Sequence, residues 1–579
     1  MIPFVDRSLR HLSHPSTRNR QATAMNLTRK ETNMKQLRKW AALLLAFVMV
    51  MTLVPIHSKA DFVQPTGTMI IKGVEEGATV KAYRLTKAKF DANGTFQGYE
   101  NIKAGTFADT TKPTNEEWLA LIKKPVGELG AAVDLTWNAA DKSYRKEGNE
   151  AGLYMILVTS KQGIVYNPML VGLAVTEDAA GKSVKDGEIN VPSAFKLPPK
   201  GDIEVELYAK KSEVPLTKTT QDPTDETQSN PKSDHGNGLA LNEKPSFTIT
   251  TQIPSYPTTD KELTFKITDT LDPGLTPPEK TSDINLTVDG NALEDGDAKI
   301  EINGQVITIT FSDAYLKGLN GKSAQVVVKY SATLNDQATV NFAANKNNVE
   351  VEYTNDPKNG GTSKKKDTTY HYTFDIDGLI NGTGSEKTHE ITKHGDLIKD
   401  GDSWEKDPLP GAEFALYNAD PTGKTIVKNK EVKDLQANEV LEMQTVTTDA
   451  TGRMNFKKLD EGVYYIKETK APTGYSLNQT VYKVEITAQY NTDGTLKSYS
   501  IEINGKKSTF EATYTTTKVV EKVDTTQDEA TLIKNTPLSE LPSTGGMGTY
   551  LFTGIGVALL AGAAVMVTLL RKKNGQTTR

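Results

Sequence analysis

The chain has 579 residues, enough for three or four domains, and a formal net charge of −5 with acidic and basic residues interspersed. This balance lacks the basic patch typical of nucleic-acid-binding proteins, so we expect no nucleic-acid partner. Cysteine is absent, which excludes disulfides, zinc–thiolate sites and cysteine nucleophiles, and we expect neither a metal nor a cofactor.

The N-terminal segment has the pattern of an export signal. Basic residues precede a mostly apolar run, 40–56, which is followed by a small-x-small cleavage site, Ser58-Lys59-Ala60. We therefore interpret residues 1–60 as a signal peptide with an over-long start, because the polar stretch at the beginning indicates that translation starts at Met25 or Met34. The alternative is an uncleaved membrane anchor, which is disfavoured because the apolar run is short for a membrane span.

Between the two ends the sequence predicts β-structure. Alternating apolar and polar stretches are rich in Val, Ile, Thr and Tyr and are bounded by Gly, Pro, Asn and Asp. They indicate an all-β fold of tandem immunoglobulin-like sandwich domains. A domain boundary is expected after Lys210. Two polar stretches, 219–238 and 355–369, are typical of domain boundaries or long loops. The expected domains are 61–210, 211–355 and 356–538.

One stretch in the first domain predicts a helix. The sequence "TNEEWLALIKK" begins at Thr114, a residue type favoured as an N-cap. Helical spacing places Trp118, Leu119 and Ile122 on one face. We expect that face to pack against the sheets.

The C-terminal end combines three features in a fixed order. Leu541-Pro542-Ser543-Thr544-Gly545 precedes an uncharged stretch, 547–570, and three basic residues follow at once. The uncharged stretch is long enough to cross a bilayer as a transmembrane helix. The basic residues place its C-terminal end on the inner side of the membrane. We treat 541–579 as one module.

Four motifs resemble parts of Gram-positive surface proteins. The tail resembles the LPxTG cell-wall sorting signal, in which a sortase cuts between Thr and Gly and passes the Thr carbonyl to an amine. The stretch "YYIKETKAPTGY", 464–475, resembles the E-box of sortase-assembled pilins, and "PLPGAEFALY", 408–417, resembles the opening of a CnaB-type domain. The stretch "FKITDTLDPGL", 265–275, is similar to the middle, CnaA-like domain of SpaA-type major pilins. Together they cover most of 200–573.

This resemblance implies a major, or backbone, pilin subunit rather than an enzyme. It implies that the first domain is Ig-like or CnaB-like, the middle one CnaA-like and the last one CnaB-type. A class C sortase would polymerise the subunit, and a housekeeping sortase would attach the fibre to peptidoglycan. The implied partners are other copies of the chain, ancillary pilins and a host surface protein, and the implied location is the surface pili of the cell wall.

Pilin domains of this kind contain a Lys–Asn isopeptide bond promoted by a neighbouring acid. The lysine must be neutral to attack the amide carbon, the acid must hold a proton to polarise the carbonyl, and burial favours both states. The resemblance assigns one set of three residues to the middle domain and one to the last: Lys218, Asp269 and Asn347, and Lys393, Glu468 and Asn535.

Residue alternation along the strands places all six of these side chains on the apolar face. Asp269, for example, shares its face with Phe265, and an unpaired ion there would be expensive. Lys393 is the weakest assignment, because Lys387 or Lys399 could take its place. The first domain offers no such set, so we predict no isopeptide bond in it.

The resemblance also implies an acceptor lysine between the first two domains. Family members carry Val-x-Val-Tyr-Pro-Lys there, and this chain has "VELYAKKS", 205–212, which makes Lys210 the expected pilin acceptor. The chain departs from the pattern, because Ala209 replaces the proline and Lys211 follows immediately. Alternation exposes Lys210 and turns Lys211 inward if the strand continues that far, and both lysines remain candidates.

Two other functions share some of these features. A monomeric LPxTG-anchored adhesin, or an ancillary pilin that binds a host matrix protein, would have the same tail and domains but would need no acceptor lysine. A surface enzyme is disfavoured, because no nucleophile elbow, HExxH, P-loop or dinucleotide-binding motif is present.

Overall fold

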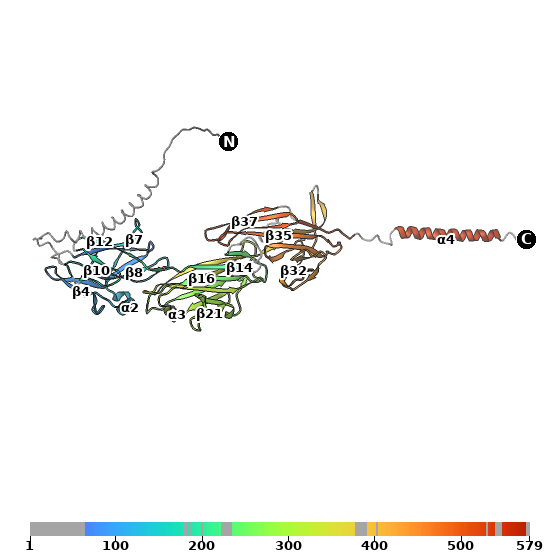
Figure 1. The fold of residues 1–579 in the computed structure, drawn as a ribbon. Helices are drawn as coiled ribbons and strands as arrows, with labels where there is room; N and C mark the ends of the chain where they lie inside the picture. Colours follow the sequence, from blue (N-terminus) through green and yellow to red (C-terminus); the bar gives the residue numbers. More distant parts are fainter. Residues whose placement is uncertain are drawn as a thin grey trace, which may run out of the picture. The chain divides into compact units, whose positions relative to one another are not determined.

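The computed structural model describes residues 64–177, 183–184, 187–198, 201–221, 234–376, 391–400, 403–450, 452–527, 531–538 and 547–574. Strands dominate these residues and helices are few, which confirms the predicted all-β fold (Figure 1). The chain divides into two compact units, one of 1–158 with 168–209 and one of 159–167 with 210–579. The predicted export signal and the sorting motif 541–545 lie outside the described residues.

The first unit consists of two sheets and a hairpin. Its sheets have the strand orders β12-β1-β7-β6 and β11-β10-β8-β2-β5, and β3 pairs with β4. Strand β1 runs parallel to β12 and antiparallel to β7, so the first and last strands of the unit are neighbours. The elements are β1 (Thr66–Lys72), β2 (Thr79–Arg84), β3 (Thr86–Phe90), β4 (Phe96–Asn101), α2 (Asn115–Lys123), η1 (Val126–Glu128), β5 (Ala132–Asp134), β6 (Thr136–Asn138), β7 (Ser143–Glu150), β8 (Gly152–Thr159), β10 (Met169–Val175), β11 (Ala194–Leu197) and β12 (Asp202–Tyr208).

Helix α2 begins as the sequence predicts but buries a different face. Thr114 is the N-cap, and its hydroxyl and the Glu117 carboxylate form a reciprocal capping box. Ile122 is buried and Trp118 packs against the core, as predicted. The prediction for Leu119 is wrong, because its side chain is 41% exposed and Leu121 is buried in the core instead. The buried stripe is rotated by only about 50° from the predicted one, because Trp118 and Ile122 belong to both.

The second unit contains the middle domain, a sandwich of a five-stranded and a six-stranded sheet. The orders are β14-β16-β23-β19-β20 and β15-β26-β25-β17-β22-β21, with two short pairs, β13-β9 and β18-β24. Its elements are β9 (Val165–Tyr166), β13 (Lys211–Ser212), β14 (Leu216–Gln221), β15 (Gly236–Gly238), β16 (Ser246–Ile253), β17 (Phe265–Leu271), β18 (Leu275–Thr276), η4 (Thr281–Asp283), β19 (Asn285–Val288), β20 (Asn291–Ala292), β21 (Ala298–Asn303), β22 (Val306–Phe311), α3 (Asp313–Gly318), β23 (Ala324–Ser331), β24 (Thr333–Leu334), β25 (Asn345–Asp356) and β26 (Gly361–Tyr372).

The sheet of the middle domain continues past the expected boundary at 355. Strand β26 pairs with β25 from His371 back to Gly361, so most of 355–369 is a hairpin and not a linker. Three consecutive lysines, 364–366, are exposed on β26. Their polar composition indicated a loop, although the backbone of the strand is paired. We place the end of this domain near Tyr372.

The last domain is built around one large sheet. Its eight strands have the order β31-β32-β30-β34-β35-β36-β37-β38, a second sheet has the order β29-β28-β39, and β27 pairs with β33. Aromatic and aliphatic side chains such as Phe414, Ile466 and Phe510 form its core. The elements are β27 (Phe374–Ile376), β28 (Ile391–Asp400), β29 (Ser403–Pro408), β30 (Glu413–Tyr417), β31 (Thr425–Val427), η6 (Val432–Asp434), β32 (Glu439–Thr447), β33 (Phe456–Leu459), β34 (Gly462–Lys470), β35 (Val481–Tyr490), β36 (Leu496–Ile503), β37 (Lys506–Tyr514), β38 (Val520–Gln527) and β39 (Thr531–Lys534).

The C-terminal segment forms the helix α4 (Met547–Asn574), visible as the long red helix in Figure 1. Within it, Thr553–Lys572 is long and apolar enough to cross a membrane. This agrees with the helix predicted from the uncharged stretch 547–570.

The two leucines of α2 provide a test of its buried face. Leu121→Ala should lower the free energy of unfolding of the first unit by about 2–5 kcal/mol, because it removes a buried side chain from a packed core. Leu119→Ala is the matched control and should cost less than about 1 kcal/mol, because its side chain is largely exposed. Thermal or urea unfolding would measure both, and equal effects would contradict the described helix orientation.

Candidate functional site

The predicted set of the middle domain is brought together between its two sheets. Lys218 lies on β14 in the five-stranded sheet, whereas Asp269 and Asn347 lie on the adjacent strands β17 and β25 of the six-stranded sheet. The burial of residues alternates along β17 and β25, and both side chains are on the buried face. All three residues are at most 2% exposed.

The contacts within this set place an amine, an acid and an amide side by side. The Lys218 Nζ donates a hydrogen bond to Asp269 Oδ1 and forms an ion pair with it. The Asn347 Nδ2 donates to the hydroxyl of Tyr330 at 2.6 Å, and Tyr330 in turn donates to Asp269 Oδ2. The Asn347 Oδ1 is buried without a hydrogen-bond partner, a state that is costly for an amide.

The surroundings of Lys218 favour its neutral form. Burial lowers the pKa of Lys218 to about 8, although the neighbouring Asp269 carboxylate acts in the opposite direction. The ring of Phe247 lies 5.4 Å from its Nζ, measured to the ring centroid. The buried His371 packs edge-on against the same ring, and burial lowers its pKa to about 3, so it adds no second positive charge. A neutral lysine amine is the form that can act as a nucleophile.

Tyr330 is a functional candidate that the sequence interpretation missed. It lies on β23, where it alternates with exposed residues and shares the buried face of Val326 and Val328. That alternation is readable from "AQVVVKYS", and it predicts an inward-facing hydroxyl that needs a polar partner. The resemblance drew attention only to lysine, acid and asparagine.

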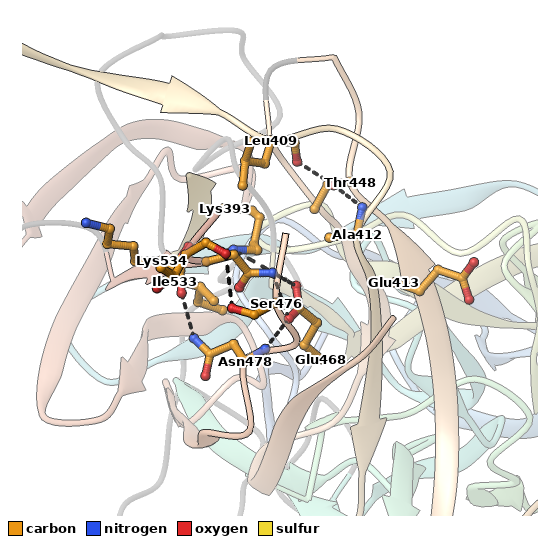
Figure 2. A network of polar contacts seen from close by, with 12 residues as sticks. Lys393, Leu409, Ala412, Glu413, Thr448, Glu468, Ser476, Asn478, Ile533 and Lys534 are labelled. Carbon is orange, nitrogen blue, oxygen red and sulfur yellow. Dashed lines mark hydrogen bonds and ion pairs between the residues drawn. The ribbon is translucent and has the colours of Figure 1, made fainter. Parts of the chain in front are cut away.

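The set of the last domain is also assembled, with a different geometry. Lys393 on β28 is paired with Ile533 on the parallel strand β39, and its Nζ donates to the Ile533 carbonyl at 3.1 Å. The same Nζ lies 3.9 Å from Glu468 Oε1, and both side chains are buried. Figure 2 shows Lys393 and Glu468 directed toward one another in the interior, with Ile533 beside them.

In this domain the acid contacts the asparagine directly. The Asn535 Nδ2 donates to both carboxylate oxygens of Glu468, at 2.9 and 3.0 Å, and the backbone N–H of Asn478 donates to Oε2 at 2.6 Å. The Asn535 Oδ1 is again buried without a partner. Burial lowers the pKa of Lys393 to about 8, opposed by Glu468. Both domains therefore join a buried lysine of depressed pKa with an acid and an asparagine.

The backbone of Lys393 is held by two neighbouring segments. Its N–H donates to the carbonyl of Gly452, and its carbonyl accepts from the N–H of Leu409. Gly452 has a φ of +72°, and a Cβ at this position would lie 2.3 Å from the Lys393 carbonyl oxygen, so only glycine allows this approach. Of the competing lysines, Lys387 lies outside the described residues, and only the backbone of Lys399 is described.

The first domain presents no comparable set in its described part. Among the lysines in the described part of the chain, the buried ones are Lys218 and Lys393, both in the later domains. Lys72, which alternation places near the core, instead extends to a half-exposed ion pair with Glu206 at 2.7 Å.

The acceptor candidate Lys210 is exposed, and it lies two residues beyond the end of β12. Strand β12 stops at Tyr208, and the Lys210 carbonyl accepts a hydrogen bond from the N–H of Asn167 at 3.1 Å. Lys211 was expected to point inward only if the first strand continued that far, and β12 ends at Tyr208. Lys211 is exposed and forms an ion pair with Glu213 at 2.8 Å.

A metal site is not formed in the described part of the chain. No three His, Asp or Glu side chains gather there as ligands would.

Four segments match models of known protein families. Residues 64–200 match the T6 antigen Ig like domain, and 243–357 match the Gram-positive pilin backbone subunit 2, Cna-B-like domain. Residues 397–500 match the SpaA prealbumin-like fold domain, and 533–576 match the LPXTG cell wall anchor motif. The sequence resemblance implies a CnaA-like middle domain, whereas the matching family model for 243–357 is described as Cna-B-like.

Two curated proteins and one solved structure are similar along much of the chain. The Trypsin-resistant surface T6 protein of Streptococcus pyogenes serotype M6 is 27% identical over 582 aligned residues, covering 90% of this chain and 97% of that protein. Fimbrial subunit type 2 of Actinomyces naeslundii is 27% identical over 302 residues, covering 47% of this chain and 50% of that protein. The structure of the T6 backbone pilin of serotype M6 Streptococcus pyogenes, a modular three-domain structure, superposes with a TM-score of 0.54 at 20% identity, covering 83% of this chain and all of that one.

The depressed pKa of Lys218 predicts that stability depends on pH in a variant that cannot form the Lys218–Asn347 bond. In Asn347→Ala, Lys218 stays free, and between pH 8 and its ordinary pKa of 10.5 the unfolded chain binds the proton that the folded chain has lost. The free energy of unfolding should therefore rise across that window, by on the order of 3 kcal/mol.

The control for this measurement is the double variant Lys218→Met with Asn347→Ala, which lacks the titrating group. Urea unfolding at several pH values would give the difference between the two variants and would cancel the titration of other residues. Parallel pH profiles for the two variants would contradict a depressed pKa at Lys218.

Proposed function

We propose that this chain, which is homologous to the T6 backbone pilin and consists of pilin domains followed by an LPXTG anchor, is the structural backbone subunit of a covalent pilus on the Gram-positive cell surface. The observation that carries this proposal is that two successive domains each bury a lysine, an acid and an asparagine, linked directly in the last domain and through Tyr330 in the middle one. Such sets are useful in a protein that has no disulfides and is exposed outside the cell.

In each set the lysine and asparagine would join as an amide. The neutral lysine Nζ attacks the Cγ of asparagine, the Cγ–Nδ2 bond breaks, and the amide nitrogen leaves as ammonia. The family resemblance gives Asp269 and Glu468 the role of holding the proton that polarises the amide carbonyl. In this structure Glu468 and the hydroxyl of Tyr330 contact the amide nitrogen instead, and both carbonyl oxygens have no hydrogen-bond partner. Each domain performs this reaction once on itself, so the acids promote a single bond and not enzymatic turnover.

The two bonds would stabilise their domains by constraining the unfolded chain. Lys218 lies on β14 near the start of its domain, Asn347 lies on β25, the strand before the last one of that domain, and Asn535 directly follows β39. Each bond closes a loop of roughly 130 residues or more, which by the chain-entropy model for disulfides corresponds to about 4–5 kcal/mol. Unlike a disulfide, the amide cannot be reduced.

Polymerisation would use the C-terminal sorting motif and a lysine between the first two domains. A class C sortase would cut between Thr544 and Gly545, and the exposed amine of Lys210 on another copy would take the Thr544 carbonyl. Until that cut, helix α4 would hold the exported chain in the membrane. A housekeeping sortase would finally transfer the fibre to peptidoglycan, where ancillary pilins or a host surface protein could join it.

The intramolecular bonds can be tested by the intact mass of the secreted region. Two bonds release two ammonia molecules, so the mass should be roughly 34 Da below that of the plain sequence, with linked peptides joining Lys218 to Asn347 and Lys393 to Asn535. Asp269→Ala and Glu468→Ala should each restore about half of that difference. A mass equal to the plain sequence would refute the crosslinks.

The intermolecular link can be tested in cells that assemble the fibre. Lys210→Ala should abolish the ladder of SDS-resistant multimers, because it removes the acceptor amine. Lys211→Ala is the matched control and should leave the ladder intact. A ladder that persists in Lys210→Ala would shift the role to another lysine, and a wild-type chain that forms no multimers would favour a monomeric anchored adhesin.

A further inference from the structure

The hydroxyl of Tyr330 occupies a position in the middle domain that the crosslinking step described above leaves unused. Its ring is buried and stacks on Phe247 with centroids 5.2 Å apart, so the side chain is fixed by packing. Its oxygen contacts all three members of the set: it donates to Asp269 Oδ2, accepts from Asn347 Nδ2 at 2.6 Å, and lies 3.4 Å from Lys218 Nζ.

These contacts form a continuous chain from the nucleophile to the leaving group. Lys218 Nζ contacts one oxygen of Asp269, Tyr330 contacts the other, and the tyrosine oxygen then contacts the nitrogen that must leave. Within the described contacts, Asp269 itself has no hydrogen bond to Asn347. These two hydrogen bonds run from Nδ2 to the hydroxyl and from the hydroxyl to the acid. Once Asp269 carries the proton and the attacked nitrogen is basic, rotation of the hydroxyl reverses both bonds, and a proton can then move from the acid to the leaving nitrogen through the tyrosine.

The reaction requires such a transfer. An amide nitrogen cannot leave as an anion at neutral pH, so it must receive a proton as the Cγ–Nδ2 bond breaks. The attacking amine carries two hydrogens when neutral and keeps one in the product amide. In balance, the Asp269 carboxyl gives its proton toward Asn347 Nδ2, which leaves as ammonia, and Asp269 then takes the surplus proton of the Lys218 nitrogen.

We propose that Tyr330 is a catalytic residue of the middle-domain crosslink, whose hydroxyl passes the proton from Asp269 to the departing nitrogen of Asn347. This inference rests on the proposed isopeptide bond and assigns a fourth group to it. In the transfer, the Tyr330 oxygen receives the Asp269 proton as its own hydrogen moves to Nδ2, so the tyrosine is neutral before and after.

The state of Tyr330 suits this role. Burial raises the pKa of Tyr330 well above its ordinary value, and the nearby Asp269 carboxylate raises it further. The hydroxyl therefore keeps its proton at physiological pH and is available as a donor.

The last domain provides an internal comparison, because its acid needs no intermediate. Both oxygens of Glu468 lie within 3.0 Å of Asn535 Nδ2, so the carboxyl group can protonate the leaving nitrogen itself. One chain therefore contains a relayed set and a direct set. A change at Tyr330 should affect the first and spare the second.

The test is a time course of crosslinking in the full chain made by cell-free translation with detergent. Samples are digested, and mass spectrometry measures the Lys218–Asn347 and Lys393–Asn535 linked peptides separately. Tyr330→Phe keeps the ring and removes the hydroxyl, and it should slow the first bond by about a hundredfold or more while the second forms at the wild-type rate. Tyr353→Phe is the matched control, because it removes another buried hydroxyl of the same domain, one that donates to the Gly163 carbonyl, and should slow neither bond.

Two results would overturn the proposal for Tyr330 alone. One is formation of the Lys218–Asn347 bond at the wild-type rate in Tyr330→Phe. The other is unfolding of the middle domain of Tyr330→Phe, by circular dichroism and protease sensitivity, under conditions where the unbonded Asp269→Ala chain stays folded, because Tyr330 would then have a structural role. A folded wild-type chain without the Lys218–Asn347 peptide would instead refute the crosslink itself, and the role of Tyr330 with it.

Discussion

A lysine side chain enclosed between two β-sheets is the constraint on which the rest of the structure depends. A charged amine in a protein interior loses its hydration, and the loss is recovered only by a partner or by release of the proton. Lys218 has one acid partner, an aromatic ring beneath its Nζ and a histidine too deeply buried to carry charge. The domain thus buries a lysine whose charged form is destabilised by lost hydration and whose neutral form is a nucleophile. Beside it lies Asn347, whose side-chain oxygen has no hydrogen-bond partner.

The two domains solve this problem with different backbone arrangements. In the middle domain the lysine comes from one sheet and the acid and asparagine from the facing one, and the Tyr330 hydroxyl lies between acid and amide. In the last domain Lys393 and Asn535 come from adjacent parallel strands or their ends, and Glu468 reaches the amide directly. The chemistry depends on which atoms meet in a dry interior, and more than one register of strands satisfies it.

The sequence correctly predicted the all-β fold and the burial of the six residues in the two Lys–acid–Asn sets. Alternation with a period of two can be read in each strand separately, without knowledge of the tertiary structure. The roles of those residues stay predictions, since alternation says nothing of reactivity. Tyr330 escaped notice because inward-facing tyrosines are common and only the three-dimensional structure shows what the hydroxyl contacts. Leu119 was misplaced because Trp118 and Ile122 define a helical face that either Leu119 or Leu121 can extend, and the structure buries Leu121. The inward orientation of Lys211 depended on continuation of the strand, and β12 ends at Tyr208.

The two proposed bonds would have a mechanical consequence for a fibre pulled from its ends. Force entering a subunit at Lys210 would meet Lys218 after a few residues, cross to Asn347, follow the main chain to Lys393 and cross again to Asn535, shortly before Thr544. Tension would thus be carried by 210–218, 347–393 and 535–544, and the chain enclosed by each proposed bond would lie outside the load path. The enclosed loops and sheets could then vary in sequence without weakening the filament, whereas a substitution that prevents either bond would return the enclosed chain of that domain to the load path.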